Sequence, residues 1–287
     1  MTARTTPYLI GYTIKPSDIT PLGQVMFTDG TNNEIRANQK QCEAYGYTYD
    51  RASGTCIAFR YNTALDRDIN NINNKFNGVG NTTQFGTNTV QINGTHNKTE
   101  GLNNNCFING SDNTIANGVN NSTVVGTLAE ATATSSIVLG GNAVKDDLGE
   151  RQNITVMFGT TTTDNTTTEA WLNNSQVASY FEIPVNSVIA FQTETIGVRT
   201  GGSAAGSVGD FKAFIEVGAA VSDSGGAITV DKSRTTIANV GTTSGWVSNV
   251  VESGGNFVQT VKGANNRTIE WVTTMRITQL KAGVTIP

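Results

Sequence analysis

A 16-residue period between residues 76 and 140 constrains the fold of this chain more than any other feature. Glycine recurs at each period, and an apolar residue stands two positions before it. The pairs are Phe76 and Gly78, Ile92 and Gly94, Ile108 and Gly110, Val124 and Gly126, and, 14 residues further on, Val138 and Gly140. A fixed period of this kind indicates a repeat architecture in which each unit stacks on its neighbours.

Each repeat contains a β-prone piece, such as TVQI, CFI or STVV, that is too short to fold alone and is bounded by Gly and Asn. We therefore expect residues 76–144 to form a short parallel β-solenoid whose coils stack about 4.8 Å apart. The apolar slots would form one inner column. Asparagines at the corners would accept left-handed backbone geometry and form side-chain ladders. The alternative, a disordered Asn/Gly/Thr-rich linker, has no reason to preserve the period.

The half-repeat G-x-N…G, written GTNTVQING and GVNNSTVVG, resembles the β-solenoid shafts of bacteriophage fibres. It is more loosely similar to the head repeats of trimeric bacterial adhesins. The resemblance covers about a quarter of the chain and implies a stalk, but it implies no particular ligand.

Composition narrows the functional classes. Charged residues make up 15% of the 287 residues, the net charge is −4, and there is no basic run, so nucleic acid is not an expected partner. No apolar run reaches the roughly 18 residues of a membrane span. The N-terminus has no apolar segment of a secretory signal. We therefore expect a virion component assembled in the host cytoplasm rather than an exported adhesin.

Residues 1–62 are predicted to form a small N-terminal module with a hairpin turn at Asp29-Gly30. Cys42 and Cys56 flank the turn DRASG, and a hairpin would bring them within bridging distance. A disulfide and two reduced, partly buried cysteines both remain open; a zinc site is excluded because further ligands are lacking. By resemblance to phage fibres, this module attaches the protein to the virion. Residues 63–75, with Ile69 and Ile72, are expected to be a helical or coiled connector.

The periodicity changes after the solenoid. Residues 145–168 are charged and then threonine-rich, which predicts a linker. Residues 169–287 contain alternating strands separated by glycine-rich turns, which predicts an antiparallel, jelly-roll-like β-sandwich. The closing strand, 269–278, is similar to that of a terminal β-sandwich domain of phage tail and head appendages.

Candidate binding residues are few. The tryptophans are expected to be core anchors first and sugar platforms second; they are Trp171, Trp246 and Trp271. If a ligand site exists, the glycine-rich loops 200–209 and 222–226 and the surroundings of Trp246 are its predicted place on the distal surface.

Catalytic signals are weak. The single histidine, His96, is expected in a turn and lacks the partners of a catalytic triad. Cys106 is expected to be a small buried apolar residue. The solenoid acids stand one or two coils apart rather than in the pair that glycosidases need; they are Glu100, Asp112 and Glu130. We therefore expect no enzyme activity, no cofactor and no metal site.

Taken together, these features predict an all-β structural protein of a bacteriophage virion, a trimeric head, neck or tail fibre. The N-terminal module would bind other virion proteins, and the distal sandwich would touch a host-surface glycan. Three copies would also bury apolar surface that the thin core of a single solenoid leaves exposed to solvent. The alternatives are a capsid decoration or cement protein, and a tailspike that cleaves polysaccharide.

Overall fold

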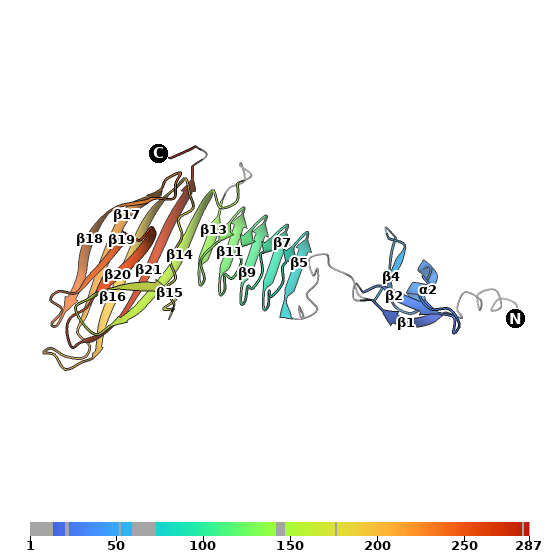
Figure 1. Ribbon diagram of the computed structural model, residues 1–287, viewed down its shortest axis with the longest axis horizontal. Coiled ribbons are helices and arrows are strands. Elements are labelled where there is room, and N and C mark those ends of the chain that lie inside the picture. Colours follow the sequence, from blue (N-terminus) through green and yellow to red (C-terminus); the bar gives the residue numbers. More distant parts are fainter. Residues whose placement is uncertain are drawn as a thin grey trace. The chain divides into compact units, whose positions relative to one another are not determined.

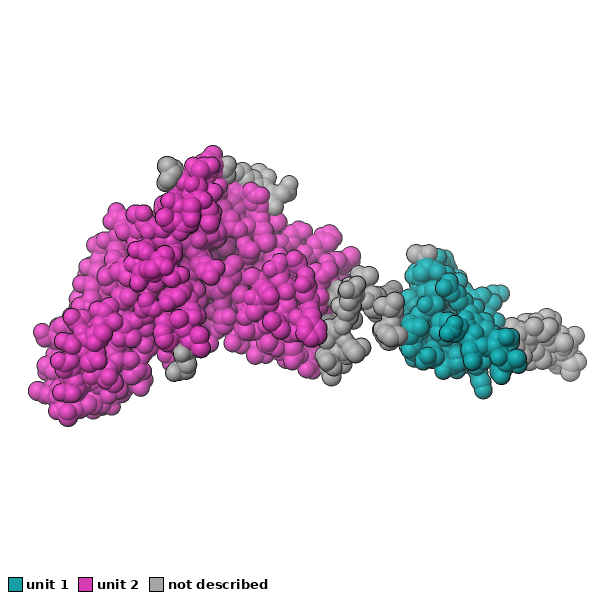
Figure 2. All heavy atoms as spheres, in the orientation of Figure 1, with its two compact units in different colours: residues 1–65 teal, residues 66–287 magenta. Residues whose placement is uncertain are grey.

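The computed structural model describes residues 14–20, 23–51, 53–58, 73–141, 147–175, 177–282 and 284–286. The chain divides into two compact units, residues 1–65 and residues 66–287 (Figure 2). The predicted connector, including Ile69 and Ile72, lies outside the described residues except for its last three positions.

The first unit is a small α/β module. Its antiparallel pairs are β1 (Lys15–Ile19) with β2 (Val25–Thr28), and β3 (Thr48–Asp50) with β4 (Thr55–Ile57). After β2 the chain turns at Asp29-Gly30, and Phe27 and Ile35 exchange backbone hydrogen bonds across this turn. The described core is small and consists of Ile14, Val25, Phe27, Ala37, Cys42 and Cys56.

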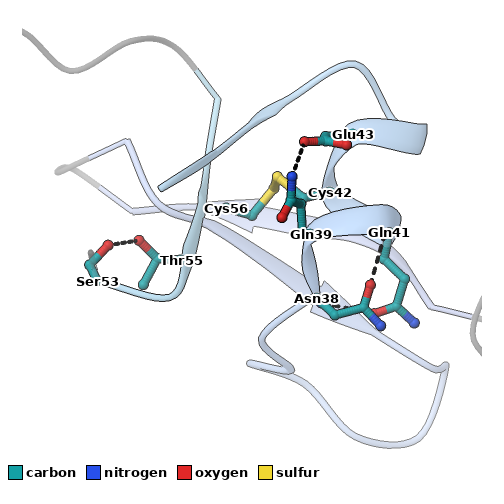
Figure 3. The surroundings of a disulfide bond; sticks show 8 residues. All are labelled: Asn38, Gln39, Gln41, Cys42, Glu43, Ser53, Thr55 and Cys56. Carbon is teal, nitrogen blue, oxygen red and sulfur yellow. Dashed lines mark hydrogen bonds between the residues drawn. A yellow bond between two sulfur atoms is a disulfide. The ribbon is translucent and has the colours of Figure 1, made fainter. Parts of the chain in front are cut away.

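A disulfide joins Cys42, on the six-residue helix α2 (Gln39–Ala44), to Cys56 on β4, with their Cα atoms 5.5 Å apart (Figure 3). Asn38 caps this helix: its side chain accepts from the Gln41 backbone N–H, and the Gln41 side chain accepts from the Asn38 N–H. A helix this short is not stable alone. The cap and the disulfide therefore hold it against the hairpin.

The second unit begins with the predicted β-solenoid, which is confirmed (Figure 1). Parallel strands stack as β5 (Lys75–Val79), β7 (Gln91–Thr95), β9 (Phe107–Ser111), β11 (Thr123–Thr127) and β13 (Ile137–Gly140). A second wall is built from the two-residue strands β6 (Thr82–Thr83), β8 (Lys98–Thr99), β10 (Thr114–Ile115) and β12 (Glu130–Ala131).

The strand register aligns the repeated apolar slot. Ile92, Ile108, Val124 and Val138 follow one another and are buried, whereas Phe76, in the first coil, is only partly buried. The glycine slot has a steric reason: a Cβ on Gly94 would lie 1.9 Å from the carbonyl oxygen of Gly110. The 16-residue glycine period is therefore required by the close approach of successive coils.

The corners of the coils adopt left-handed backbone at more residue types than the sequence predicts. Left-handed backbone was expected at Asn and Gly, but His96, Asp112 and Leu128 also adopt it, with φ between 54° and 57°. These residues are 16 apart and occupy the same corner of successive coils. Because stacking imposes the same path on each coil, tertiary structure overrides the local preference against φ above zero.

The expectation that residues 145–168 are a linker is wrong, because they contain the 12-residue strand β14 (Arg151–Thr162). This strand pairs antiparallel with β13, the last long strand of the solenoid. The Gln152 side chain accepts from the Glu130 backbone N–H and donates to the Glu130 carbonyl, which closes the last short strand. An open solenoid end would leave such backbone groups unpaired. The segment predicted as a linker therefore caps the solenoid.

The remaining strands form two antiparallel sheets that are joined through β15 (Thr167–Leu172), which pairs with β14 as well as with the smaller sheet, and the larger one is continuous with the solenoid sheet rather than a separate domain (Figure 1). Its order is β18 (Ile228–Val240), β17 (Phe211–Ser222), β16 (Ser187–Gly201), β21 (Thr268–Lys281) and β14. The smaller sheet contains β15, β20 (Asn256–Lys262) and β19 (Val247–Ser253). Side chains of the two sheets meet, as shown by the Phe191 and Phe257 rings, 5.4 Å apart.

Candidate functional site

Trp246, the predicted distal surface residue, is buried with 1% of its surface exposed. It packs against Trp271, with ring centroids 5.7 Å apart, in a cluster with Phe214, Val261 and Ile269. The prediction of a surface around Trp246 is therefore wrong, because the ring fills the space between the two sheets. Trp171 is the tryptophan that stays partly exposed.

The structure does not bring the two predicted glycine-rich loops together with an exposed tryptophan. The buried Arg199 guanidinium donates to four carbonyl groups around the loop 200–209, those of Gly201, Gly202, Ala204 and Ala205. The loop 222–226 is ordered separately, since the Asp223 carboxylate accepts from the N–H groups of Gly225 and Ala227. Both loops are held in place by internal hydrogen bonds.

Two aromatic side chains instead converge on Glu169. Strand β15 places Glu169 and Trp171 on one side, because alternate residues of a strand share a face. One carboxylate oxygen, Oε2, accepts from the Tyr180 hydroxyl at 2.8 Å and from the Trp171 indole N–H at 3.4 Å. The hydrogen bond to the Glu169 carboxylate, with a smaller effect of burial, raises the pKa of Tyr180. The phenol therefore stays a hydrogen-bond donor at neutral pH.

Tyr180 also lines an open pocket of about 480 Å³ between the solenoid and the segment after β15. The solenoid contributes Asn117–Val119 and Thr132–Thr134, and the other wall includes Tyr180 and Glu182. We call Glu169, Trp171, Tyr180 and Glu182, with this pocket, the Tyr180 site. An aromatic body beside amide, hydroxyl and carboxylate groups suits a ligand with many hydroxyl groups.

The segment that carries Tyr180 was predicted as a strand, YFEIPV, and this is where the sequence reasoning missed the site. The chain turns after β15 through Asn173 and Asn174, both with positive φ. Phe181 then anchors the segment by a single bridge to Phe257 and is 1% exposed. Alternation places Tyr180 and Glu182 on the opposite side from the buried Phe181. The order Tyr180-Phe181-Glu182, in which a buried apolar residue separates two polar ones, was the signal in the sequence that could have indicated this site.

The solenoid residues singled out from the sequence have structural partners. Glu100 lies 2.8 Å from Lys98, Asp112 lies 3.8 Å from His96, and Glu130 lies 2.8 Å from Lys281. Cys106 is buried, and the loss of solvent raises the pKa of its thiol.

Neither a metal cluster nor a membrane helix is found in the part of the chain that the structure describes. No three His, Cys, Asp or Glu side chains gather as metal ligands would, within those residues. Within the same residues, no helix has the length and apolar character to cross a membrane.

No protein-family model and no curated protein matches the sequence. Among solved structures, the chain is similar to the tailspike protein of Acinetobacter baumannii phage AM24, with 8% identity and a TM-score of 0.28 over 74% of this chain and 50% of that one. It is also similar to a tailspike of A. baumannii bacteriophage Fri1, a capsular polysaccharide depolymerase, with 10% identity and a TM-score of 0.27 over 75% and 48%. A third is the Acinetobacter phage vB_ApiP_P1 tailspike, with 6% identity and a TM-score of 0.21 over 74% and 49%.

The chain thus spans about half the length of the tailspikes that it resembles. TM-scores below 0.3 do not define a common fold, so no residue role is transferred from them to this chain.

The expectation that the chain is not an enzyme is corrected here, since one of these structures is that of a polysaccharide depolymerase. His96 and the acids of the solenoid are the catalytic candidates visible in the sequence. Two further carboxylates lie near Tyr180: Glu169 accepts from its hydroxyl, and Glu182 lines the same pocket.

Proposed function

We propose that this protein is an appendage of a bacteriophage virion that binds a host-surface glycan at the Tyr180 site. The observation that carries the proposal is the single Glu169 carboxylate oxygen that accepts from both the partly exposed Trp171 and Tyr180, of which Tyr180 lines a polar pocket. Aromatic rings pack against the apolar faces of sugars, and a fixed ring loses little conformational entropy when it binds.

A glycan array of bacterial capsular polysaccharides and lipopolysaccharides tests the proposal with the full chain. We expect the wild type to bind a subset of these glycans. Trp171→Ala should lower the affinity at least about tenfold, roughly 1.4 kcal/mol. Tyr180→Phe, which removes only the hydroxyl that donates to Glu169, should give a smaller loss.

Phe85→Ala is the matched control, since Phe85 is an exposed aromatic residue (79%) in the first solenoid coil. It should leave binding unchanged. Equal binding by the wild type and Trp171→Ala would contradict the assignment of the site.

A second candidate function is cleavage of the bound glycan, and the observation that favours it is that two carboxylates lie near Tyr180. Glu169 accepts two hydrogen bonds from aromatic donors, and Glu182 lines the pocket. Glycoside hydrolysis divides acid and base roles between two carboxyl groups. Incubation with a glycan that binds, followed by measurement of new reducing ends, tests this candidate. Glu182→Gln should abolish release while leaving binding in place.

We further propose that the first unit attaches the chain to other virion proteins and that the chain assembles as a homotrimer. The disulfide-bonded module is compact and carries its own core, which is what an attachment unit needs. Labelling of intact virions with antibodies against residues 14–58 and 147–282 tests this arrangement. Exposed second-unit epitopes with masked first-unit epitopes would support it. A cement protein would instead show both units flush with the capsid.

A further inference from the structure

The larger C-terminal sheet has a face, on the side opposite the smaller sheet, that carries large apolar side chains. The described residues contain seven such side chains on this face, each more than 40% exposed. They are Ile137, Leu139, Met157, Ile196, Val217, Val272 and Leu280. They belong to β13, β14, β16, β17 and β21, and we call this surface the outer face.

Strand register makes the outer face contiguous. Ile196 lies directly opposite Val272 on β21 and opposite Ala213 on β17. Two rows further along the same face, Gln192 lies opposite both Arg276 and Val217, and the row between them contains Glu194 opposite Thr274 and Ile215. Directly opposite residues of an antiparallel sheet present their side chains on the same side, about 5 Å apart. The apolar side chains therefore share one face across neighbouring strands, with polar side chains such as Gln192 and Glu194 between them.

Strand β16 carries more apolar residues on its outward face than a strand with one solvent-facing side needs. Its inward residues Ile189 and Phe191 are buried against the smaller sheet, as expected. Its outward residues include four apolar ones, Val188, Ala190, Ile196 and Val198, together with the polar Gln192, Glu194 and Thr200. A strand with one wet face alternates apolar and polar residues. The outward residues of β16 instead indicate a partner.

The charges of the outer face favour a second copy of this chain as that partner. Strands β14, β16, β17 and β21 place two acidic and two basic side chains on it, all exposed: Glu194, Glu270, Arg151 and Arg276. Because the signs balance, two copies meet without net repulsion and can exchange pairs such as Glu194 with Arg276. A partner with a large net charge would find no complementary net charge on this face.

The size and relief of the face also fit self-association. Four strands about 4.8 Å apart and about ten residues long span roughly 650 Å² in projection. A corrugated surface of that span approaches the roughly 800 Å² per partner of a standard interface. An apolar hollow of about 500 Å³ lies where the solenoid meets this sheet, lined by residues including Leu139, Thr278 and Leu280. It offers a place for a protruding side chain.

We infer that the outer face is the surface through which copies of this chain assemble. The inference rests on the homo-oligomer proposed above and names its interface. Multi-angle light scattering of the full chain tests it. The wild type should elute as an assembly, and the double variant Ile196→Lys with Val217→Lys should elute as a monomer with unchanged far-UV circular dichroism. Val208→Lys, a change of the same charge at a loop position that is 67% exposed, should assemble as the wild type does.

A wild type that stays monomeric at all concentrations, or a double variant that still assembles, would overturn the inference. If the double variant does not fold, Val217→Thr decides, since threonine keeps the β-branched shape and strand preference. It should raise the half-assembly concentration about tenfold. Glycan affinity per chain is measured in parallel. A dissociated variant should retain this affinity and lose only the increase in apparent affinity that several linked sites provide. Failure of glycan binding is therefore distinguishable from failure of assembly.

Discussion

The side-chain amide of Asn113 donates to the Oδ1 atom of Asn97, 2.9 Å away and 16 residues earlier in the chain. Asn97 in turn donates to the Oδ1 of Asn81 at 3.0 Å. All three side chains are buried, and each donates to the carbonyl of a glycine in the next coil: Gly94, Gly110 or Gly126. The ladder thus replaces the backbone partners that a corner would otherwise lose.

Asn97→Ala should destabilise the solenoid by about 2–6 kcal/mol. It leaves the Asn113 N–H and the Gly110 carbonyl without the Asn97 side chain, and each buried unpaired group costs about 1–3 kcal/mol. Urea denaturation followed by circular dichroism measures the change. Asn109→Ala, at an exposed position of β9, is the control and should change stability by less than about 0.5 kcal/mol. Equal stability of the two variants would contradict the role of the ladder.

Gly94→Ala should prevent the coils from stacking, because the added methyl would lie 1.9 Å from the Gly110 carbonyl oxygen and Gly94 has a φ of +115°. We expect loss of soluble folded protein, measured by expression yield and circular dichroism. Gly118→Ala is a matched comparison: its φ is +75°, but nothing lies within 4 Å of the added methyl. It should cost only the left-handed backbone strain, about 1–2 kcal/mol. A soluble, cooperative Gly94→Ala protein would show that the coils can separate.

Cys42→Ser should unfold the first unit selectively. The disulfide closes a loop of 14 residues in sequence separation, and such a link contributes about 3 kcal/mol. The described core of this unit has only six buried apolar residues, so little else compensates. Limited proteolysis should release a fragment that contains the second unit, while Cys106→Ala leaves the first unit protected. Undiminished protease resistance in Cys42→Ser would mean that the core suffices without the disulfide.

Cys106 should be the only thiol to appear on denaturation and should react slowly in the native protein. Burial raises the pKa of its thiol above the ordinary value of 9.0. A raised folded-state pKa stabilises the fold below the unfolded pKa and loses this contribution as pH rises toward the folded value. The stability of the wild type should therefore fall as the pH rises above about 9.

Cys106→Val should lessen that fall, since Val90 already fills the equivalent place one coil earlier and is buried. Reaction with a chromogenic disulfide reagent, with and without denaturant, gives the rate. Immediate reaction in native buffer would contradict the burial of this thiol.

Local sequence patterns were enough for the features that repeat. The spacing of Ile92, Gly94, Ile108 and Gly110 predicted both the stacked strands and the inner column, because each coil repeats the same steric problem. The Tyr180 site could not be found in this way. Glu169, Tyr180 and the solenoid corners come together through a turn after β15 and a single bridge between Phe181 and Phe257, and neither has a periodic signal.

By itself the sequence determined that residues 76–140 wind into stacked coils, since a glycine every 16 residues is needed wherever two backbones approach this closely. Only the tertiary structure decided how the solenoid ends. Gln152 satisfies the backbone of Glu130, and Lys281 reaches the Glu130 carboxylate from 151 residues away. It also decided that Trp246 is buried while Trp171 is partly exposed. A repeated local constraint is written in the spacing of residues, whereas a contact made once between distant strands depends on how the sheets pack.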